Sequence, residues 1–308
     1  DLAAILAARS NLKIGQHSMK TVILTTLALI AFAANSVLCR LALGGGTIDA
    51  ASFTVIRLIA GIIVLFIIAA FAAPLIAATP SKSESIQSRG SWQAGAMLFL
   101  YAVTFSFAYI SLDTGTGALI LFGSVQITMI LWSLITGTRL QRLEWAGVVV
   151  AFAGFVYLVM PGVSAPSLTG FLLMTSAGIA WGIYTLKGRG SASPLMDTTF
   201  NFVRTIPFLL ILLLLTFQQA ELSMQGAVLA SLSGGLASGV GYTIWYSALR
   251  GLSSTQAAVV QLSVPIIAAM GGVVIVSEPI TARLLLSTCL ILGGIVLVIY
   301  SRYQPQRA

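Results

Sequence analysis

Ten long apolar runs constrain this chain more than any other feature of its sequence. Each run is long enough to cross the roughly 30 Å hydrocarbon core of a bilayer as an α-helix. The composition agrees, because 58% of the 308 residues are hydrophobic and only 8% are charged, whereas a soluble domain carries about 25% charged residues. We therefore predict an all-α integral membrane protein with ten transmembrane helices. The runs cover Lys20–Cys39, Ile48–Phe71, Ser91–Leu112, Gly115–Thr136, Leu143–Met160, Leu168–Lys187, Asp197–Phe217, Gln225–Leu249, Ser254–Val276 and Thr281–Tyr300.

The segment ahead of the first run, residues 1–19, is set apart from the rest of the chain. Its apolar stretch Leu2–Ala8 is too short to span a bilayer or to mark a signal peptide. We expect either a native amphipathic prefix or a remnant that precedes a natural start at Met19, and we assign it no part in function. The rest divides into a first half at 20–162, a second half at 163–303 and a cytoplasmic tail at 304–308.

The loops between the runs carry Lys and Arg with a strong bias toward one side. If the N-terminus is cytoplasmic, only Arg40 and Arg283 of the 16 Lys and Arg fall in outer loops, while Arg57 and Arg204 lie within runs. All the other basic residues then lie on the cytoplasmic side, as the positive-inside rule requires. The bias predicts that both termini are cytoplasmic and favours an even number of spans.

The two halves show an internal repeat, in which four short matches follow in the same order. A shift of 149 residues places Asn35 on Tyr184, and a shift of 147 places Arg57 on Arg204. Further matches follow in the same order between the fourth and ninth runs and between the fifth and tenth. Each half has an odd number of spans, so the second half must enter the membrane from the opposite side. The repeat therefore predicts two inverted five-helix halves around a central cavity, where such transporters bind their solutes.

Short motifs near the end of each half resemble those of a known family. The second half contains Pro265, then Ser277-Glu278, then Gly293-Gly294, whereas the first half has Gln126 in place of the proline and Thr138 in place of the glutamate. With ten runs in two halves, this pattern resembles the EamA-like family of the drug/metabolite transporter superfamily, and within it the amino-acid exporters. The resemblance implies a basket of ten helices around a central cavity. It also implies a place in the bacterial inner membrane and the export of amino acids, often aromatic ones.

The sequence gives no support to catalysis. The single histidine, His17, lies in the prefix, so neither a zinc motif nor a Ser-His-Asp arrangement is available, and we expect no catalytic residue, metal or cofactor. No acid lies near the centre of a run. Small multidrug antiporters of the superfamily use a carboxylate in their first helix, and Thr21–Leu38 contains none, which argues against proton-coupled export of cationic drugs by that mechanism. The scattered basic residues do not indicate nucleic acid as a partner.

Two arginines, Arg57 and Arg204, lie inside runs at matching positions of the two halves. One interpretation is that each extends to the headgroups or anchors a helix end against backbone carbonyls. The other is that they bind a carboxylate of the solute, because a charge within a span is a functional hypothesis by default. The sequence leaves both interpretations open.

Polar and aromatic side chains inside the runs are the candidates for contact with a solute. A polar group in lipid must find a partner, so these residues are expected to face the bundle interior. For any one of them, an interhelical hydrogen bond is the alternative to substrate contact. Tyr242, Trp245 and Tyr246 lie three and four residues apart and therefore share one helix face. The predicted substrate-binding residues are Asn35, Tyr101, Trp181, Tyr184, Tyr242, Trp245, Tyr246 and Gln261.

These observations predict a multi-pass inner-membrane transporter that exports amino acids or similar small zwitterions by alternating access. Its expected partners are a small-molecule substrate and the lipid bilayer. The alternative is export of another small solute, such as a nucleobase, a sugar derivative or a cationic compound. The oligomeric state stays open, and a monomer is compatible with the sequence.

Overall fold

The computed structural model describes residues 2–77, 90–137, 141–162, 165–188, 191, 193–249, 251–252 and 254–303, and within them almost every apolar run is helical. An isolated antiparallel bridge joins Ile48 to Leu222. The first half contributes five helices, one for each of the first five runs. They are α1 (Leu2–Gly44), α2 (Ala50–Ala77), α3 (Trp92–Ala108), α4 (Thr114–Ile135) and α5 (Arg142–Val159).

The second half follows the same order, but three of its five runs are broken into shorter pieces. The sixth run is α6 (Leu168–Gly188) and the tenth is α13 (Ala282–Tyr303). The seventh run comprises α7 (Pro194–Val203), α8 (Ile206–Thr216) and the 3₁₀ turn η1 (Phe217–Gln219). The eighth comprises α9 (Met224–Ser231), the π-helix η2 (Leu232–Val240) and α10 (Gly241–Leu249), and the ninth α11 (Ser254–Gln261), α12 (Val264–Gly271) and the π-helix η3 (Gly272–Val276).

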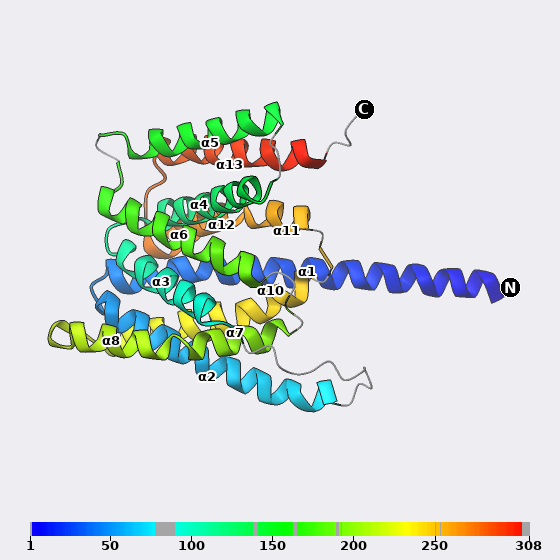
Figure 1. Cartoon of the computed structure of the whole chain (residues 1–308), viewed down its shortest axis with the longest axis horizontal. Coiled ribbons are helices and arrows are strands. Elements are labelled where there is room, and N and C mark those ends of the chain that lie inside the picture. Colours follow the sequence, from blue (N-terminus) through cyan, green and yellow to red (C-terminus); the bar gives the residue numbers. More distant parts are fainter. Residues whose placement is uncertain are drawn as a thin grey trace.

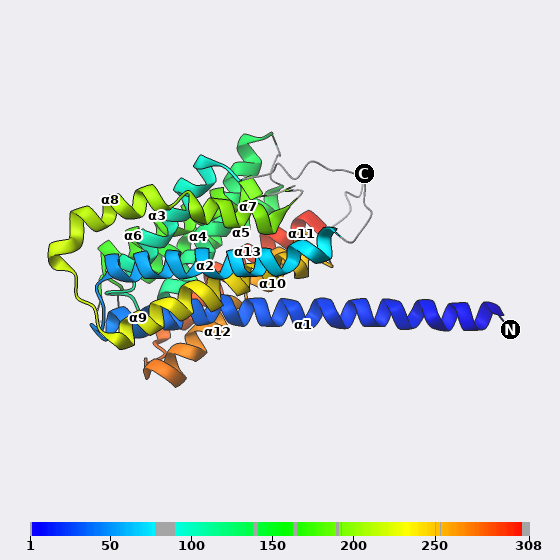
Figure 2. The ribbon, with the colours of Figure 1, turned by 90° about the horizontal axis from the view of Figure 1, so that it is seen from below.

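Nine helical segments of the described chain are long and apolar enough to cross a membrane, which confirms nine of the ten predicted spans. The tenth, α3, has 17 residues and falls just short of that length. In Figure 1 the segments run side by side with alternating direction, and α3 lies among them. Residues 2–18 continue α1 as a helix well beyond the bundle (Figures 1 and 2), so the predicted prefix is continuous with the first span.

Two ends of the bundle can be distinguished in Figure 1. The helix α1 enters and α13 finishes at the proximal end, and the α3–α4 turn lies at the opposite, distal end. Side chains on the outside of the bundle are large and apolar, such as Val274 (80% exposed) and Leu215 (77% exposed). Such a surface is stable in lipid, where apolar contact costs nothing and the helices satisfy their own backbone groups.

The helices of the first half pack mainly against those of the second. The most extensive contacts are those of α5 with α13, α3 with α6, α4 with α6, α2 with η2, and α1 with α10. Small residues permit this approach. A Cβ atom on Gly178 of α6 would lie 2.5 Å from the Cβ of Ser124 on α4, and one on Gly182 would lie 3.0 Å from the Cβ of Thr128. The pair Gly178 and Gly182 is thus a small-x₃-small contact, the packing that such spacing favours in membranes.

Prolines explain two of the breaks. Pro207 lies at the start of α8 and Pro265 at the start of α12, because a proline lacks the N–H that would continue the preceding helix. The hydroxyls of Thr205 and Ser263 donate to the carbonyl oxygens of Phe202 and Val260 three residues earlier. Both runs are broken at these prolines, and side-chain hydroxyls partly replace the lost backbone hydrogen bonds.

Candidate functional site

A small cavity lies inside the bundle between helices of both halves. Its volume of about 20 Å³ has room for about one water molecule. Three of its lining positions come from α1, two each from α3 and α4, one from α6, and three from the η2–α10 segment. The lining residues are Phe32, Asn35, Ser36, Tyr101, Phe105, Leu121, Phe122, Trp181, Ala237, Ser238 and Tyr242.

A chain of hydrogen bonds connects four helices beside this cavity. The hydroxyl oxygen of Tyr101 on α3 accepts from Arg57 Nη2 on α2 at 3.0 Å and from Asn35 Nδ2 on α1 at 3.3 Å. Asn35 Oδ1 in turn accepts from the hydroxyl of Ser233 on η2 at 2.6 Å. All four side chains are buried. Hydrogen bonds in a low dielectric reinforce one another, so this network fixes the relative positions of the four helices.

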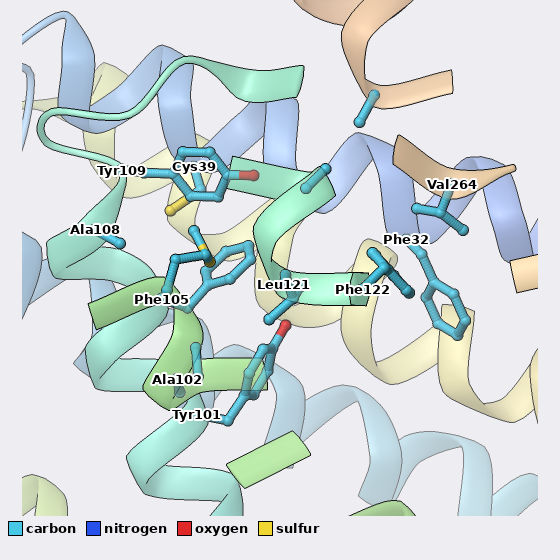
Figure 3. Packing of buried hydrophobic residues seen from close by; sticks show 14 of the residues in the cluster. Phe32, Cys39, Tyr101, Ala102, Phe105, Ala108, Tyr109, Leu121, Phe122 and Val264 are labelled. Carbon is cyan, nitrogen blue, oxygen red and sulfur yellow. The ribbon is translucent and has the colours of Figure 1, made fainter. Parts of the chain in front are cut away.

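Aromatic rings form one wall of the cavity, centred on Trp181. Its ring centroid lies 4.8 Å from that of Tyr101, 5.0 Å from that of Tyr242 and 5.3 Å from that of Tyr184, on which it stacks. Phe32 adds an edge-on contact with Tyr242 at 5.9 Å. Figure 3 shows Tyr101 and Phe105 from α3 beside Leu121 from α4. Such a wall suits a solute with an apolar body and a few polar groups.

The structure brings together most of the residues predicted to bind substrate. Asn35, Tyr101, Trp181 and Tyr242 line the cavity. Behind them, Tyr184 stacks on Trp181, and Trp245 contacts Phe32 with ring centroids 5.7 Å apart. The other two predicted residues are also outside the lining and only partly buried: Tyr246 packs against the core, and Gln261 ends α11. The shared face of Tyr242, Trp245 and Tyr246 is therefore only partly directed at the cavity.

Several lining residues were not selected from the sequence. Ser36 and Ser238 are polar residues within apolar runs, so their chemistry was a usable signal. Phe32 and Phe105 resemble any other apolar residue of a transmembrane helix, and nothing local distinguishes them. Their position at the cavity depends on which face of α1 and α3 is turned inward.

The two arginines that match in sequence differ in the structure. Arg57 is 1% exposed, and its guanidinium carbon lies 4.8 Å from the ring centroid of Phe105. Arg204 is partly buried, donates to the carbonyl oxygen of Phe200 and lies 5.8 Å from the ring of Trp92. Arg204 thus fits the interpretation as a helix-end anchor, whereas that interpretation is wrong for Arg57, which does not reach the bundle surface.

A cluster of charges lies at the distal end, and we call Arg40, Asp113 and Glu278 the distal latch. Arg40 Nε lies 2.9 Å from Glu278 Oε1 and its Nη2 3.4 Å from Asp113 Oδ1, and Nη1 donates to the carbonyl oxygens of Tyr109 and Ile110. Burial and then the Glu278 carboxylate raise the pKa of Asp113, which Arg40 opposes.

Glu278 has a second role in the distal latch. Its Oε2 accepts from the backbone N–H of Thr114 at 2.8 Å, at the first residue of α4, where a negative charge is favoured by the helix dipole. The preceding Ser277 has φ = 60°, a left-handed conformation that glycine adopts at less cost. Glu278 therefore joins α1, the start of α4 and the loop before α13.

Comparison with known proteins identifies the family. A model of the EamA-like transporter family matches residues 168–300. An uncharacterized transporter of Archaeoglobus fulgidus is 30% identical over 202 residues, which cover 63% of this chain and 68% of that protein. The chain belongs to the EamA-like transporter family. It is accordingly a membrane transporter and not an enzyme, as the sequence predicted.

Two further relatives and one solved structure are informative for this EamA-like transporter. An uncharacterized protein of Pseudomonas aeruginosa is 47% identical over 283 residues, 92% of this chain and 96% of that protein. A probable amino-acid metabolite efflux pump of Salmonella typhimurium is 24% identical over 228 residues, 66% of this chain and 76% of that protein. A solved crystal structure, 17% identical, superposes with a TM-score of 0.58 over 91% of this chain and 99% of that one. The last likeness shows a shared fold.

Proposed function

We propose that this EamA-like protein exports amino acids or similar small zwitterions across the bacterial inner membrane through the central cavity. The observation that carries the proposal is the cavity itself, in which the aromatic wall around Trp181 faces the polar network of Asn35 and Tyr101. An apolar surface beside hydrogen-bonding groups matches an amino acid with an apolar side chain. The similarity to a probable amino-acid metabolite efflux pump supports the same substrate class.

The pairing of loops and helices supports two inverted halves. At the distal end, Asp49 Oδ2 before α2 accepts from the backbone N–H of Glu221 before α9 at 3.0 Å. At the proximal end, Asp197 Oδ1 in α7 accepts from the N–H of Gly90 before α3 at 2.8 Å. Asp49 and Asp197 are 148 residues apart, within the shift of the sequence repeat. The packing of α1 on α10 is likewise matched by that of α6 on α3, as an inverted repeat requires.

The small size of the cavity supports alternating access. An amino acid needs far more room than the 20 Å³ present, so the helices around the cavity must separate before a solute enters. The distal latch holds one end closed by ion pairs of Arg40. The π-helix η2 lies beside the cavity, and such segments interrupt the regular hydrogen bonding of a helix, often at functional sites. We infer that solute exchange requires the latch to open.

A flux assay tests the proposed function. In proteoliposomes containing the full chain, we expect uptake of radiolabelled phenylalanine, tryptophan or leucine in preference to uracil, a sugar phosphate or a cationic dye. Trp181→Ala is expected to lower the initial rate about tenfold, because several ring contacts of about 0.5–1.5 kcal/mol each are lost. The matched control is Trp145→Ala, since Trp145 is 52% exposed on α5 and lies outside the cavity lining.

The outcomes of this assay are distinct. Preferential flux of uracil, the sugar phosphate or the dye would replace amino acids by one of the alternative substrates. Normal flux in a monodisperse Trp181→Ala protein, together with failure of Trp145→Ala, would contradict the assignment of the cavity.

The proposed topology has its own test. We expect both termini to be cytoplasmic, because the basic residues concentrate on that side. Reporter fusions after Arg307 and after Ser167 should therefore report opposite compartments, since Ser167 lies at the start of α6. Alkaline phosphatase activity paired with fluorescence of a cytoplasmic reporter measures this directly. The same compartment for both sites is incompatible with ten spans.

A further inference from the structure

Arg57 carries a buried charge for which the described chain provides no opposite charge. It lies about 10 Å along α2 from the first residue, Ala50, and is 1% exposed. The ionisable side chains that interact electrostatically with Arg57 are Tyr101, Tyr242 and Cys39, and these are neutral at ordinary pH. The acids among the described residues lie at helix ends or in loops, Asp49, Asp113, Glu144, Asp197, Glu221 and Glu278.

The guanidinium is only partly satisfied. Its Nη2 donates to the hydroxyl of Tyr101, and its carbon lies 4.8 Å from the ring centroid of Phe105 and 5.2 Å from that of Tyr101. Nε and Nη1 have no hydrogen-bond partner among the residues that the structure describes. An arginine side chain does not lose its proton in proteins, and a buried charge is costly unless it is paired. The position therefore favours a bound anionic group.

This charge lies one side chain behind the cavity. Tyr101 and Phe105, which contact the guanidinium, both line the cavity, and Asn35 lines it while donating to the same hydroxyl as Arg57. In a low-dielectric interior, a charge that is one side chain away attracts an anion far more strongly than it would in water. The matching residue of the second half, Arg204, contacts Phe200 and Trp92 at the proximal end. Of the two arginines, only Arg57 therefore places a fully buried charge beside the cavity.

We propose that Arg57, together with Tyr101 and Asn35, forms a binding site for the carboxylate of the transported solute. The inference rests on the proposed function in one respect, that the solute occupies the central cavity. Asn35 and Tyr101, which line the cavity, hold the carboxylate by hydrogen bonds, and Arg57 behind them supplies the positive charge. The rings of Trp181 and Tyr242 hold the apolar part. Solutes without an anionic group then leave the buried charge unpaired and bind poorly.

Matched pairs of ligands test this proposal on the purified full chain, in detergent for calorimetry and in proteoliposomes for uptake. Each pair differs by one carboxylate: phenylalanine against phenethylamine, and orotate against uracil. We expect calorimetry or competition for uptake to show about tenfold or greater preference for the carboxylate member, the scale of one hydrogen bond to a charged group. Arg57→Met should abolish this preference, Arg57→Lys should keep part of it, and the control Arg204→Met should keep all of it.

Each outcome is decisive for one of the two proposals. A folded Arg57→Met protein that retains the carboxylate preference overturns the site, as does a wild type without preference in either pair. If Arg57→Met does not fold, Tyr101→Phe removes only the hydroxyl that accepts from Arg57 and must also weaken the preference. If the wild type prefers orotate over uracil but neither binds nor moves phenylalanine, the anion site stands and amino-acid export fails. If phenylalanine and phenethylamine are transported equally well, amino-acid export stands and the anion site fails.

Discussion

Replacing Gly234 by alanine is expected to destabilise the folded protein more than any other single change considered. A Cβ atom on Gly234 of η2 would clash with the carbonyl oxygen of Arg57 and lie 2.6 Å from its carbonyl carbon. Both are backbone atoms, so no side-chain rotation relieves the contact, and α2 must move away from η2. We expect a loss of about 3 kcal/mol or more, the upper end of the range for overpacking. The midpoint of thermal unfolding and the monodisperse yield in detergent measure it.

The matched control for this change is Gly293→Ala. Gly293 lies in α13, and a Cβ atom there meets nothing within 4 Å. Alanine is a better helix former than glycine by up to about 1 kcal/mol, so this variant should be as stable as the wild type or more so. Equal stability of Gly234→Ala and Gly293→Ala would show that the close contact of α2 with η2 is not needed for folding.

Glu278→Gln is expected to open the distal end. The substitution keeps the size of the side chain but weakens its contacts with Arg40 and the N–H of Thr114. A hydrogen bond to a charged group contributes about 1.5–3 kcal/mol, so the ratio of open to closed protein should rise about tenfold. Cys39 reports the change, because it is fully buried beside Tyr109, as Figure 3 shows. In a Cys289→Ser background, maleimide should label Cys39 about tenfold faster.

Glu221→Gln provides the same charge change at the same end of the bundle. Its side chain is exposed, and the contacts of Glu221 with Asp49 use its backbone, so the labelling of Cys39 should stay at the wild-type rate. If Glu278→Gln and Glu221→Gln label alike, the distal latch does not control access. If Glu278→Gln speeds the labelling of Cys39 but also lowers the midpoint of thermal unfolding to a matching extent, the faster labelling reflects general loosening of the fold. The latch assignment is then rejected.

The spans were largely predictable, and the places where prediction was incomplete have physical causes. The breaks at Pro207 and Pro265 are of a kind that a sequence can predict, since a missing N–H acts locally wherever a proline lies in a helix. The π-helices η2 and η3 had no comparable mark in the sequence. Gly234 of η2 meets the backbone of α2, and Gly272 of η3 meets the side chains of Thr114 and Glu278, so both lie at contacts that only the packed bundle brings together. The helix α3 is shorter than its apolar run, because the chain turns at 109–112 toward α4.

The candidate site was predictable in its chemistry but not in its membership. Asn35, Tyr101, Trp181 and Tyr242 were found as polar or aromatic residues in apolar runs, and they line the cavity. Gln261 met the same criterion but lies at the end of α11, away from that lining. A polar side chain in a span must be satisfied somewhere, and neighbouring helices decide whether that place is the cavity or another contact.

The sequence by itself determined the class of protein and nine of its spans, because the bilayer tests each segment for apolarity almost independently of the others. The short motifs near the end of each half, together with the ten runs, indicated its family. Only the tertiary structure separated Arg57 from Arg204, which have the same residue type and the same place in the repeat. One is enclosed by Tyr101 and Phe105 beside the cavity, and the other is held at the proximal end by Phe200 and Trp92. The depth and partners of a charge depend on contacts between segments distant in the chain, and these form only when the helices pack together.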